Sequence, residues 1–332
     1  MKLRLSALSL ILLAVTGCVA MPSEQNPVAP PKSQYDARVF DAETGTPLTV
    51  RELAGQLANT DVVVVGEYHG HHASHLLQAR LQQALFRQTP RQILTMEQFN
   101  LDHQDILNRF LAGDLGETEM IEDAEAWNNY RASYRPLMEF ARQNRLPVIA
   151  ANAPADVVRC VGRKGPDYLK ALPPETRALL PETPFLDTPA YKEKFVEAIG
   201  GSHGTETDEL SERMRNTYHA QLLRDNTMAR AILEAQSNHP GHQILHTTGT
   251  FHSEERLGTV AVLAKRAPEL SIAVITPVFW PDEEDNVPLE ANRGKGDYLY
   301  FIQPLPEEFR DPERERKAME ARFTDRKSAD CK

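Results

Sequence analysis

A run of four valines followed by glycine occupies residues 62–66. Unbroken β-branched residues of this kind are typical of a strand buried on both faces of a parallel sheet. Together with five further apolar runs, it predicts strands at 61–66, 91–96, 146–151, 243–248, 271–276 and 298–302. Helical patterns lie between some of them, near 72–88, 102–112 and 131–144. This alternation predicts an α/β fold with a mostly parallel central sheet flanked by helices.

The interval 153–240 contains no convincing strand. It carries helical patterns near 165–180, 189–199 and 208–236. We therefore expect a large helical insertion over the C-terminal edge of the strands. Open parallel sheets bind their ligands at that edge.

The N-terminus has the pattern of a secretory leader. Lys2 and Arg4 precede an apolar run from Ala7 to Val15, and Val-Thr-Gly-Cys18 follows. The run is about half of the ~20 residues that a membrane-spanning helix needs, so it predicts a signal peptide. Because small residues precede the cysteine, we expect a lipoprotein, cut before Cys18 and acylated there, for example with palmitate. The alternative is an ordinary signal with a chance cysteine.

The chain then divides into four parts. We expect a signal peptide at 1–17, a lipidated cysteine with a proline-rich tether at 18–34, one α/β domain at 35–310 and a charged tail at 311–332. The tether spans at most ~50–55 Å, which keeps the domain near the membrane. Val19 follows the cysteine where enterobacterial inner-membrane lipoproteins have aspartate, so the expected location is the cell envelope, at the outer membrane.

Composition restricts the partners. The net charge of −10 argues against a nucleic-acid partner. With Cys18 lipidated, Cys160 and Cys331 remain. They could pair in an oxidising compartment, but Cys331 sits in a polar tail, and we expect them to stay unpaired. Beyond the leader, no segment looks able to span a membrane.

Potentially reactive side chains come after three of the predicted strands. Glu67 and His69 come after the first, Glu97 after the second, and His252 after the fourth. Since the carboxyl ends of parallel strands meet at one edge, we expect these groups within about 10 Å of one another. They are candidates for general acid–base catalysis, and His69, Glu97 and His252 also for a divalent metal. For a glutamate such as Glu97, a salt bridge or helix cap is the structural alternative.

The three further histidines His71, His72 and His75 begin a helix, where solvent exposure is the simpler expectation. No Gly-x-Ser-x-Gly comes directly after a predicted strand, which argues against the usual α/β-hydrolase serine. No Gly-x-Gly-x-x-Gly comes after a strand, which argues against a dinucleotide cofactor.

An aromatic block runs from Trp127 to Pro136. Tyr130 and Tyr134 are four residues apart and would share a helical face. Core packing explains such spacing as well as function does. A tyrosine can also ligate haem iron, and an arginine such as Arg135 can hold the propionates.

Taken together, these motifs resemble those of the ChaN-like haem-binding lipoproteins, within the wider Tiki, TraB and erythromycin-esterase superfamily. The resemblance runs over about 60–303. Its marks are Gly66-Glu-x-His69, Met96-Glu97, Trp127-x-x-Tyr130-x-x-x-Tyr134-Arg-Pro136, Ala150-Ala-Asn152, His203-Gly204, Gln221-Leu-Leu-Arg224-Asp225-Asn-Thr-Met228-Ala229, Gly249-x-x-His252 and Gly296-Asp297-Tyr298.

The resemblance implies a surface lipoprotein that binds haem for iron acquisition and forms a homodimer over it. It implies a tyrosine as iron ligand and histidine near the propionates, which makes Tyr130, Tyr134, His69, His252 and Arg135 candidate haem-binding residues, with Tyr168 in reserve. Hydrolases of the wider superfamily use residues that correspond to His69, Glu97 and His252, some with a metal, so an envelope hydrolase is the alternative. The turn Gly249-Thr-Phe251-His252 and the adjoining Ser253–Arg256 depart from the family pattern beside this site.

Overall fold

The computed structural model describes residues 28–200, 211–281, 284–324 and 331. The predicted signal peptide, Cys18 and most of the tether therefore lie outside the described residues. Among the helices that are described, none combines the length and the apolar character needed to cross a membrane.

All six predicted strands are present in one sheet of eight, whose order is β2-β1-β8-β7-β3-β6-β4-β5. The six are mutually parallel: β3 (Val62–Glu67), β4 (Gln92–Asn100), β5 (Val148–Asn152), β6 (Gln243–Gly249), β7 (Ile272–Phe279) and β8 (Tyr298–Ile302). The remaining two, β1 (Arg38–Asp41) and β2 (Pro47–Leu48), were not predicted and extend the sheet antiparallel beyond β8.

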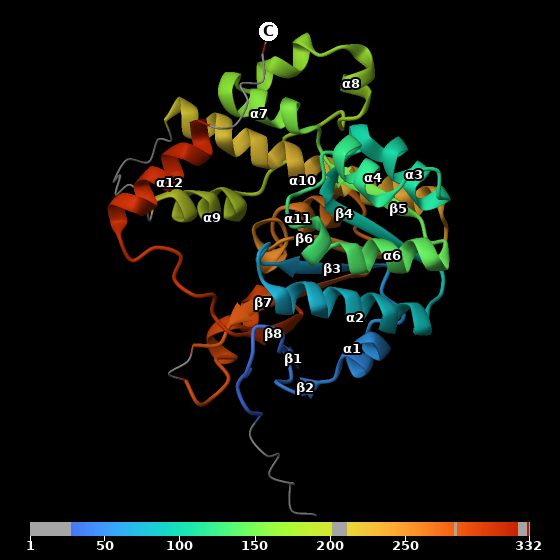
Figure 1. Cartoon of the computed structure of the whole chain (residues 1–332), viewed down its shortest axis with the longest axis vertical. Coiled ribbons are helices and arrows are strands. Elements are labelled where there is room, and N and C mark those ends of the chain that lie inside the picture. The colour runs from blue at the N-terminus through green and yellow to red at the C-terminus, as the bar shows by residue number, and fades with distance from the viewer. Residues whose placement is uncertain (1–27, 201–210, 282–283, 325–330, 332) are drawn as a thin grey trace, which may run out of the picture.

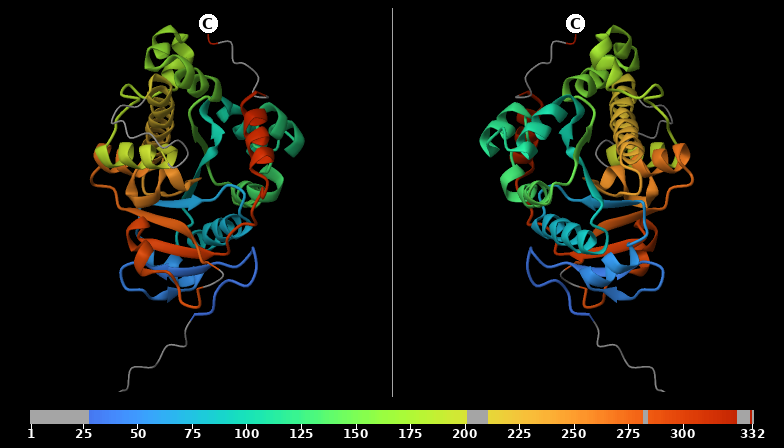
Figure 2. Two further views of the ribbon diagram at one scale, coloured as in Figure 1. Left: turned by 90° about the vertical axis from the view of Figure 1, so that its left-hand side faces the viewer. Right: turned by 90° about the vertical axis from the view of Figure 1, so that its right-hand side faces the viewer.

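The valine run explains how the sheet is covered on both faces. Side chains alternate along a strand, and Val63 and Val65 enter one core while Val62 and Val64 enter the other. Figure 2 shows the resulting layers with helices on either side of the sheet. One face carries α1 (Val50–Gln56), α2 (His72–Gln88), α3 (Gln104–Ala112), α4 (Glu117–Asp123), α5 (Tyr130–Ser133) and α6 (Arg135–Asn144). The other carries α10 (Glu212–Asn238) and α11 (Thr259–Arg266).

The helical insertion is present, but its pieces differ from those predicted. It consists of α7 (Ala155–Lys164), the 3-10 helix η2 (Pro166–Ala171), α8 (Pro174–Ala178), α9 (Pro189–Gly200) and α10. The continuous helix predicted at 165–180 is wrong because Gly165, at φ +83°, ends α7, and prolines at 166, 173 and 174 break the segment after it into short pieces.

The insertion covers the carboxyl edge of the sheet only in part. Its α7 and α8 lie beyond the edge strand β5, whereas α9 approaches the carboxyl ends of the strands (Figure 1). Short 3-10 helices complete the connections: η1 (Leu101–His103), η3 (Thr250–His252), η4 (Glu254–Arg256) and η5 (Glu290–Lys295).

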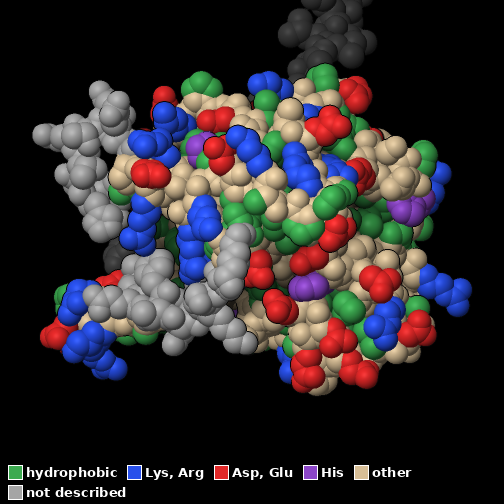
Figure 3. Space-filling model, turned by 90° about the horizontal axis from the view of Figure 1, so that it is seen from above, with side chains coloured by type: hydrophobic (Ala, Val, Ile, Leu, Met, Phe, Trp, Pro, Cys, Tyr) green, Lys and Arg blue, Asp and Glu red, His purple; other side chains and the backbone are tan. Residues whose placement is uncertain are grey.

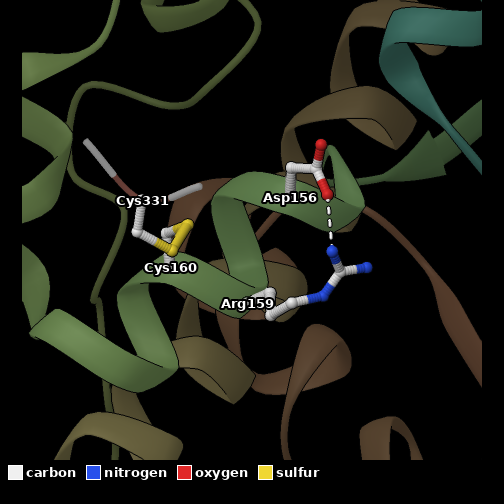
Figure 4. Close-up of a disulfide and its surroundings, with 4 residues drawn as sticks. All are labelled: Asp156, Arg159, Cys160 and Cys331. Carbon is white, nitrogen blue, oxygen red and sulfur yellow. Dashed lines mark hydrogen bonds and ion pairs between the residues drawn. A yellow bond between two sulfur atoms is a disulfide. The ribbon is translucent and has the colours of Figure 1, made fainter. Parts of the chain in front are cut away.

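The charged tail forms the helix α12 (Pro312–Thr324). Cys331 is disulfide-bonded to Cys160 of α7, with the two Cα atoms 5.6 Å apart (Figure 4). Our expectation that these cysteines stay unpaired is therefore wrong. Sequence separation of 171 residues concealed their proximity, because the end of the chain returns to the insertion. Seen from above, the molecule carries interspersed acidic and basic side chains (Figure 3).

Candidate functional site

The site begins where β3, β4 and β6 end. Glu67 is the last residue of β3 and is 1% exposed. Glu97 was expected just after its strand, but β4 continues to Asn100, and its register against β5 shifts between Met96 and Asn100. Glu97 therefore sits within an irregular strand end, where it too is buried.

Glu67 is enclosed by donors from four directions. Its carboxylate accepts hydrogen bonds from His69 Nδ1 (2.7 Å), Gln78 Nε2 (2.7 Å), Gln98 Nε2 (3.2 Å) and Tyr134 Oη (2.7 Å). A buried carboxylate is costly unless it is hydrogen-bonded. This set of donors explains how the charge is tolerated at the end of a core strand.

His69 is the partner of Glu67 that reaches the surface. Its side chain is 46% exposed, and the ring of Trp127 meets it edge-on at 4.8 Å between centroids. Burial lowers the pKa of His69, but the hydrogen bond to Glu67 and the charges of Glu97 and Glu67 outweigh that effect and raise it. The Glu67 contact fixes Nδ1 as the protonated nitrogen and leaves Nε2 as the acceptor in the neutral ring.

Glu97 lies on the other side of this histidine. Its Oε2 accepts from Thr248 Oγ1 (2.6 Å) and from the backbone N–H of Gly249 (2.7 Å). Burial raises the pKa of Glu97, but the charges of His252 and His69 and these two hydrogen bonds outweigh it and lower the pKa to about 2. Glu97 is thus a fixed anion at the edge.

His252 forms a second carboxylate–histidine pair. Its Nδ1 lies 2.8 Å from Oδ1 of Asp225 in α10, and its Nε2 lies 3.7 Å from Glu97 Oε1. Asp225 also accepts from Thr259 Oγ1 (2.8 Å) and Tyr191 Oη (2.6 Å). Burial lowers the pKa of His252, but Asp225 and Glu97 outweigh it and raise the pKa.

Two glycines let these groups approach the backbone. A Cβ atom at Gly249 would lie 2.8 Å from His69 Nε2, so the imidazole packs directly against the end of β6. Gly258 has φ +55°, and its Cβ would lie 2.8 Å from Asp225 Oδ1. A larger residue at either position would displace one of the two histidine–carboxylate pairs.

The carboxyl edge therefore holds Glu67–His69 and Asp225–His252 on either side of Glu97. The structure brings together the four residues predicted as catalytic, and their donors and acceptors can bind or transfer protons. The predicted divalent metal finds no support, since no group of three or more His, Cys, Asp or Glu side chains in the described part of the chain is arranged to hold one.

The aromatic block does not present a helical face to a ligand. Tyr130 and Tyr134 are 2% and 0% exposed, and burial raises the pKa of both. Tyr130 packs edge-on with Phe99, which fits the core-packing alternative, while Tyr134 binds Glu67. Arg135, predicted to hold a propionate, donates through Nε and Nη2 to Glu117 instead.

The histidines at the start of α2 divide into two kinds. His72 is exposed, as expected, and stacks on Tyr35. His71 and His75 are buried, which contradicts the expectation for them. The ring of His71 accepts from the N–H of Ala73 and caps the helix, and His75 contacts the carbonyl oxygen of His69.

Sequence reasoning did not assign a role to Asp225. The sequence signal that could have found it is the family mark around Asp225, in which three polar residues follow one another. In the structure these three, Asp225, Asn226 and Thr227, are all fully buried within α10. A helix that buries three consecutive polar side chains must provide each with a partner. For Asp225 that partner is His252.

The departures from the family pattern after β6 have a structural role. Phe251 packs against Tyr191 of α9 at 5.4 Å between ring centroids, and Lys194 of α9 lies 5.8 Å above the Phe251 ring. Lys194 Nζ also lies 3.2 Å from Glu254 Oε2. These residues hold α9 against the turn that carries His252.

A family model described as "Haem-binding uptake, Tiki superfamily, ChaN" matches residues 53–263. The chain belongs to this family. The match includes every carboxyl-edge residue described above, from Glu67 to His252. A search of curated proteins finds no match.

One solved structure shares the fold of this chain, and others align with it less well. ChaN of Campylobacter jejuni, described as binding haem cofacially, aligns with a TM-score of 0.60 at 15% identity, covering 83% of this chain and all of that one. A Bacillus cereus protein gives 0.43 at 13% identity, covering 77% and 98%. A mutant of the erythromycin esterase EreC gives 0.44 at 13% identity, covering 86% and 87%. At 15% identity the likeness to the Campylobacter protein concerns the fold alone.

Proposed function

We propose that this protein binds haem at the carboxyl edge of its sheet, as an envelope lipoprotein that serves iron uptake. The observation that carries the proposal is membership of the haem-binding uptake family over residues 53–263. The polar edge described above lies wholly within that range.

Whether the edge fits haem can be tested on its side chains. An iron ligand needs an accessible lone pair. Tyr130 and Tyr134 are buried, and His252 has 8% of its side chain exposed, whereas His69 has 46%. We therefore propose that His69 would hold the haem iron, through Nε2. The hydrogen bond from Nδ1 to Glu67 orients the ring and raises its basicity, as carboxylate partners of ligating histidines do.

The remaining residues would support this ligand. Gly249 has no side chain, and this lets the His69 ring pack against the end of β6. Tyr134, Gln78 and Gln98 hold Glu67 in place by hydrogen bonds. Haem itself supplies the iron that uptake requires.

Hemin titration of the full-length lipoprotein in detergent, followed by visible absorption, tests the proposal. We expect binding by the wild type and at least a tenfold loss of affinity in His69→Ala. The matched control is His72→Ala, three residues away and exposed, which should bind as the wild type does. Absence of hemin binding by the wild type would refute haem binding, and an unchanged spectrum in His69→Ala would refute His69 as ligand.

The lipid anchor on Cys18 and the outer-membrane location are part of the same proposal. They rest on the Val-Thr-Gly-Cys18 motif and on Val19 after it. Cys18→Ala should no longer fractionate with membranes. Persistent palmitate labelling of that variant would contradict the anchor.

Dimerisation on haem binding is also proposed, from the resemblance to the family. Light scattering after size-exclusion chromatography, with and without hemin, measures it directly. We expect the mass to double on addition of hemin. A constant mass at saturating hemin would contradict it.

An envelope hydrolase is the second candidate, favoured by the two carboxylate–histidine pairs around Glu97. A histidine oriented by a carboxylate is suited to act as a general base on water. The candidate catalytic groups are His69, Glu97 and His252, with Glu67 and Asp225 as positioning residues. If the wild type hydrolyses activated esters such as p-nitrophenyl acetate and His252→Ala loses that activity without losing hemin binding, the hydrolase is supported. Equal rates of ester hydrolysis by the wild type and by His252→Ala would refute the hydrolase.

A further inference from the structure

A second hollow lies away from the carboxyl edge, between the segment after α8 and the helices α10 and α11. It is a groove of about 930 Å³. Leu180, Pro181 and Leu233 form apolar walls. The charged residues of the lining are three arginines and two glutamates: Arg177, Arg230, Arg266, Glu182 and Glu234.

The three arginines converge on one short stretch of backbone. Nη1 of Arg177 and Nη1 of Arg230 both donate to the carbonyl oxygen of Leu180, at 3.3 and 2.6 Å. Nη2 of Arg266 donates to the carbonyl oxygen of Thr183 at 2.8 Å. Because both donate to the carbonyl oxygen of Leu180, the guanidinium groups of Arg177 and Arg230 lie side by side.

Their charge is only partly balanced. Arg230 pairs with Glu234, with Nε and Oε1 2.6 Å apart. Within the described part of the chain, Arg177 and Arg266 form no ion pair, and they donate to carbonyl, amide and hydroxyl oxygens. Burial and the charge of Arg230 lower the pKa of Arg266.

The guanidinium groups also keep unused donors. Each has five N–H groups. Arg177 engages acceptors through Nη1, and Arg266 through Nη1 and Nη2, so that Nε of both is left without an acceptor among the described residues. Carboxylates and phosphates match such donors in geometry and in charge.

We propose that this groove binds an amphipathic anion, with a carboxylate or phosphate head held by Arg177 and Arg266 and a short apolar body against Leu180 and Leu233. The site is distinct from the carboxyl edge and does not depend on haem binding. Its ligand class follows from two observations: the three arginines of the lining outnumber its two glutamates, and an apolar wall lies in the same hollow.

A purely structural role makes a different prediction. If the arginines serve only to bind the carbonyl groups of residues 178–183, their removal lowers stability and no anion binds. Isothermal titration of the full-length protein separates the two roles. Suitable probes are octanoate, octyl phosphate and inorganic phosphate.

We expect at least one alkyl anion to bind more tightly than inorganic phosphate, because the apolar walls contribute. The better of octanoate and octyl phosphate identifies the head group. Arg177→Gln should weaken that binding at least tenfold. Arg51→Gln, an exposed position on α1 across the sheet, is the matched control and should bind as the wild type does.

Leu233→Glu provides a variant that leaves all three arginines in place. It puts a carboxylate into the groove and should abolish binding of the alkyl anion while the protein still unfolds cooperatively. The proposal is overturned if neither alkyl anion binds the wild type. It is also overturned if Arg177→Gln and Leu233→Glu both bind with wild-type affinity.

Discussion

Asp225 Oδ1 lies 2.8 Å from His252 Nδ1, although 27 residues separate them in the chain. The carboxylate comes from the middle of α10, and the histidine comes from the turn after β6. This contact joins the helix layer on one face of the sheet to the carboxyl edge. It also gives the edge its second carboxylate–histidine pair.

Asp225→Asn should lower the pKa of His252, because the charge that favours the imidazolium is removed. The pKa of His252 is higher in the folded protein than in the unfolded chain, where it is near 6.5. The pair therefore stabilises the fold fully at pH values below the pKa of the unfolded chain. This contribution is lost as the pH rises through the pKa of the folded protein. The loss of stability in the variant should therefore be largest in acid and shrink toward alkaline pH. Histidine NMR titration measures the pKa of His252, and urea unfolding at several pH values measures the free energy of unfolding. Asp156→Asn, at an exposed position, is the control. An unchanged His252 pKa would contradict the prediction.

Glu97→Gln should alter stability with the opposite pH dependence. Its pKa is lowered from 4.5 to about 2, so its contribution is present above 4.5 and is lost as pH falls through about 2. A shift of this size corresponds to on the order of 3 kcal/mol. We expect the stability difference between wild type and variant to shrink between pH 4.5 and 2, as measured by denaturant unfolding. A difference that stays constant over this window would refute the assignment.

The two tyrosines of the aromatic block should respond differently to removal of the hydroxyl. Tyr134→Phe leaves the buried carboxylate of Glu67 with one donor fewer, at a cost of about 1–3 kcal/mol. Tyr130→Phe removes a buried hydroxyl that has no hydrogen-bond partner in the described structure, so stability should hold or rise. Thermal unfolding of the matched pair measures this. Equal destabilisation by Tyr134→Phe and Tyr130→Phe would contradict the role of the Glu67 contact. If either variant loses the hemin spectrum, the tyrosine that was replaced is the iron ligand.

The disulfide should stabilise the oxidised protein. Replacing Cys160 and Cys331 together by alanine should lower the free energy of unfolding by about 2–5 kcal/mol, because the unfolded chain is no longer cross-linked. The difference should vanish when both proteins are measured with a reducing agent. Peptide mass spectrometry without reduction checks the bond itself. Two free thiols at these positions in protein from the envelope would refute it.

Local pattern was enough to place most of the sheet. The apolar runs at Val62–Val65 and in the five other parallel strands reflect burial on both faces of the sheet. Such a run can be recognised in each strand by itself. Parallel strands share one carboxyl edge, so Glu67, His69, Glu97 and His252 could be brought together before their contacts were known. The short strands β1 and β2 could not be predicted because they are defined by pairing, of β1 with β8 and of β2 with β1, rather than by an apolar run.

The sequence by itself determined the six parallel strands, their common carboxyl edge and four of the residues that meet there. Tertiary structure alone decided their partners. The rotation of α10 about its axis turns Asp225 toward His252, and the packing of α5 and α6 on the sheet buries Tyr130 and Tyr134. The path of the tail brings Cys331 to Cys160. The physical reason is that periodicity records which side of an element is buried, whereas a hydrogen bond or disulfide between distant residues depends on how separate elements pack.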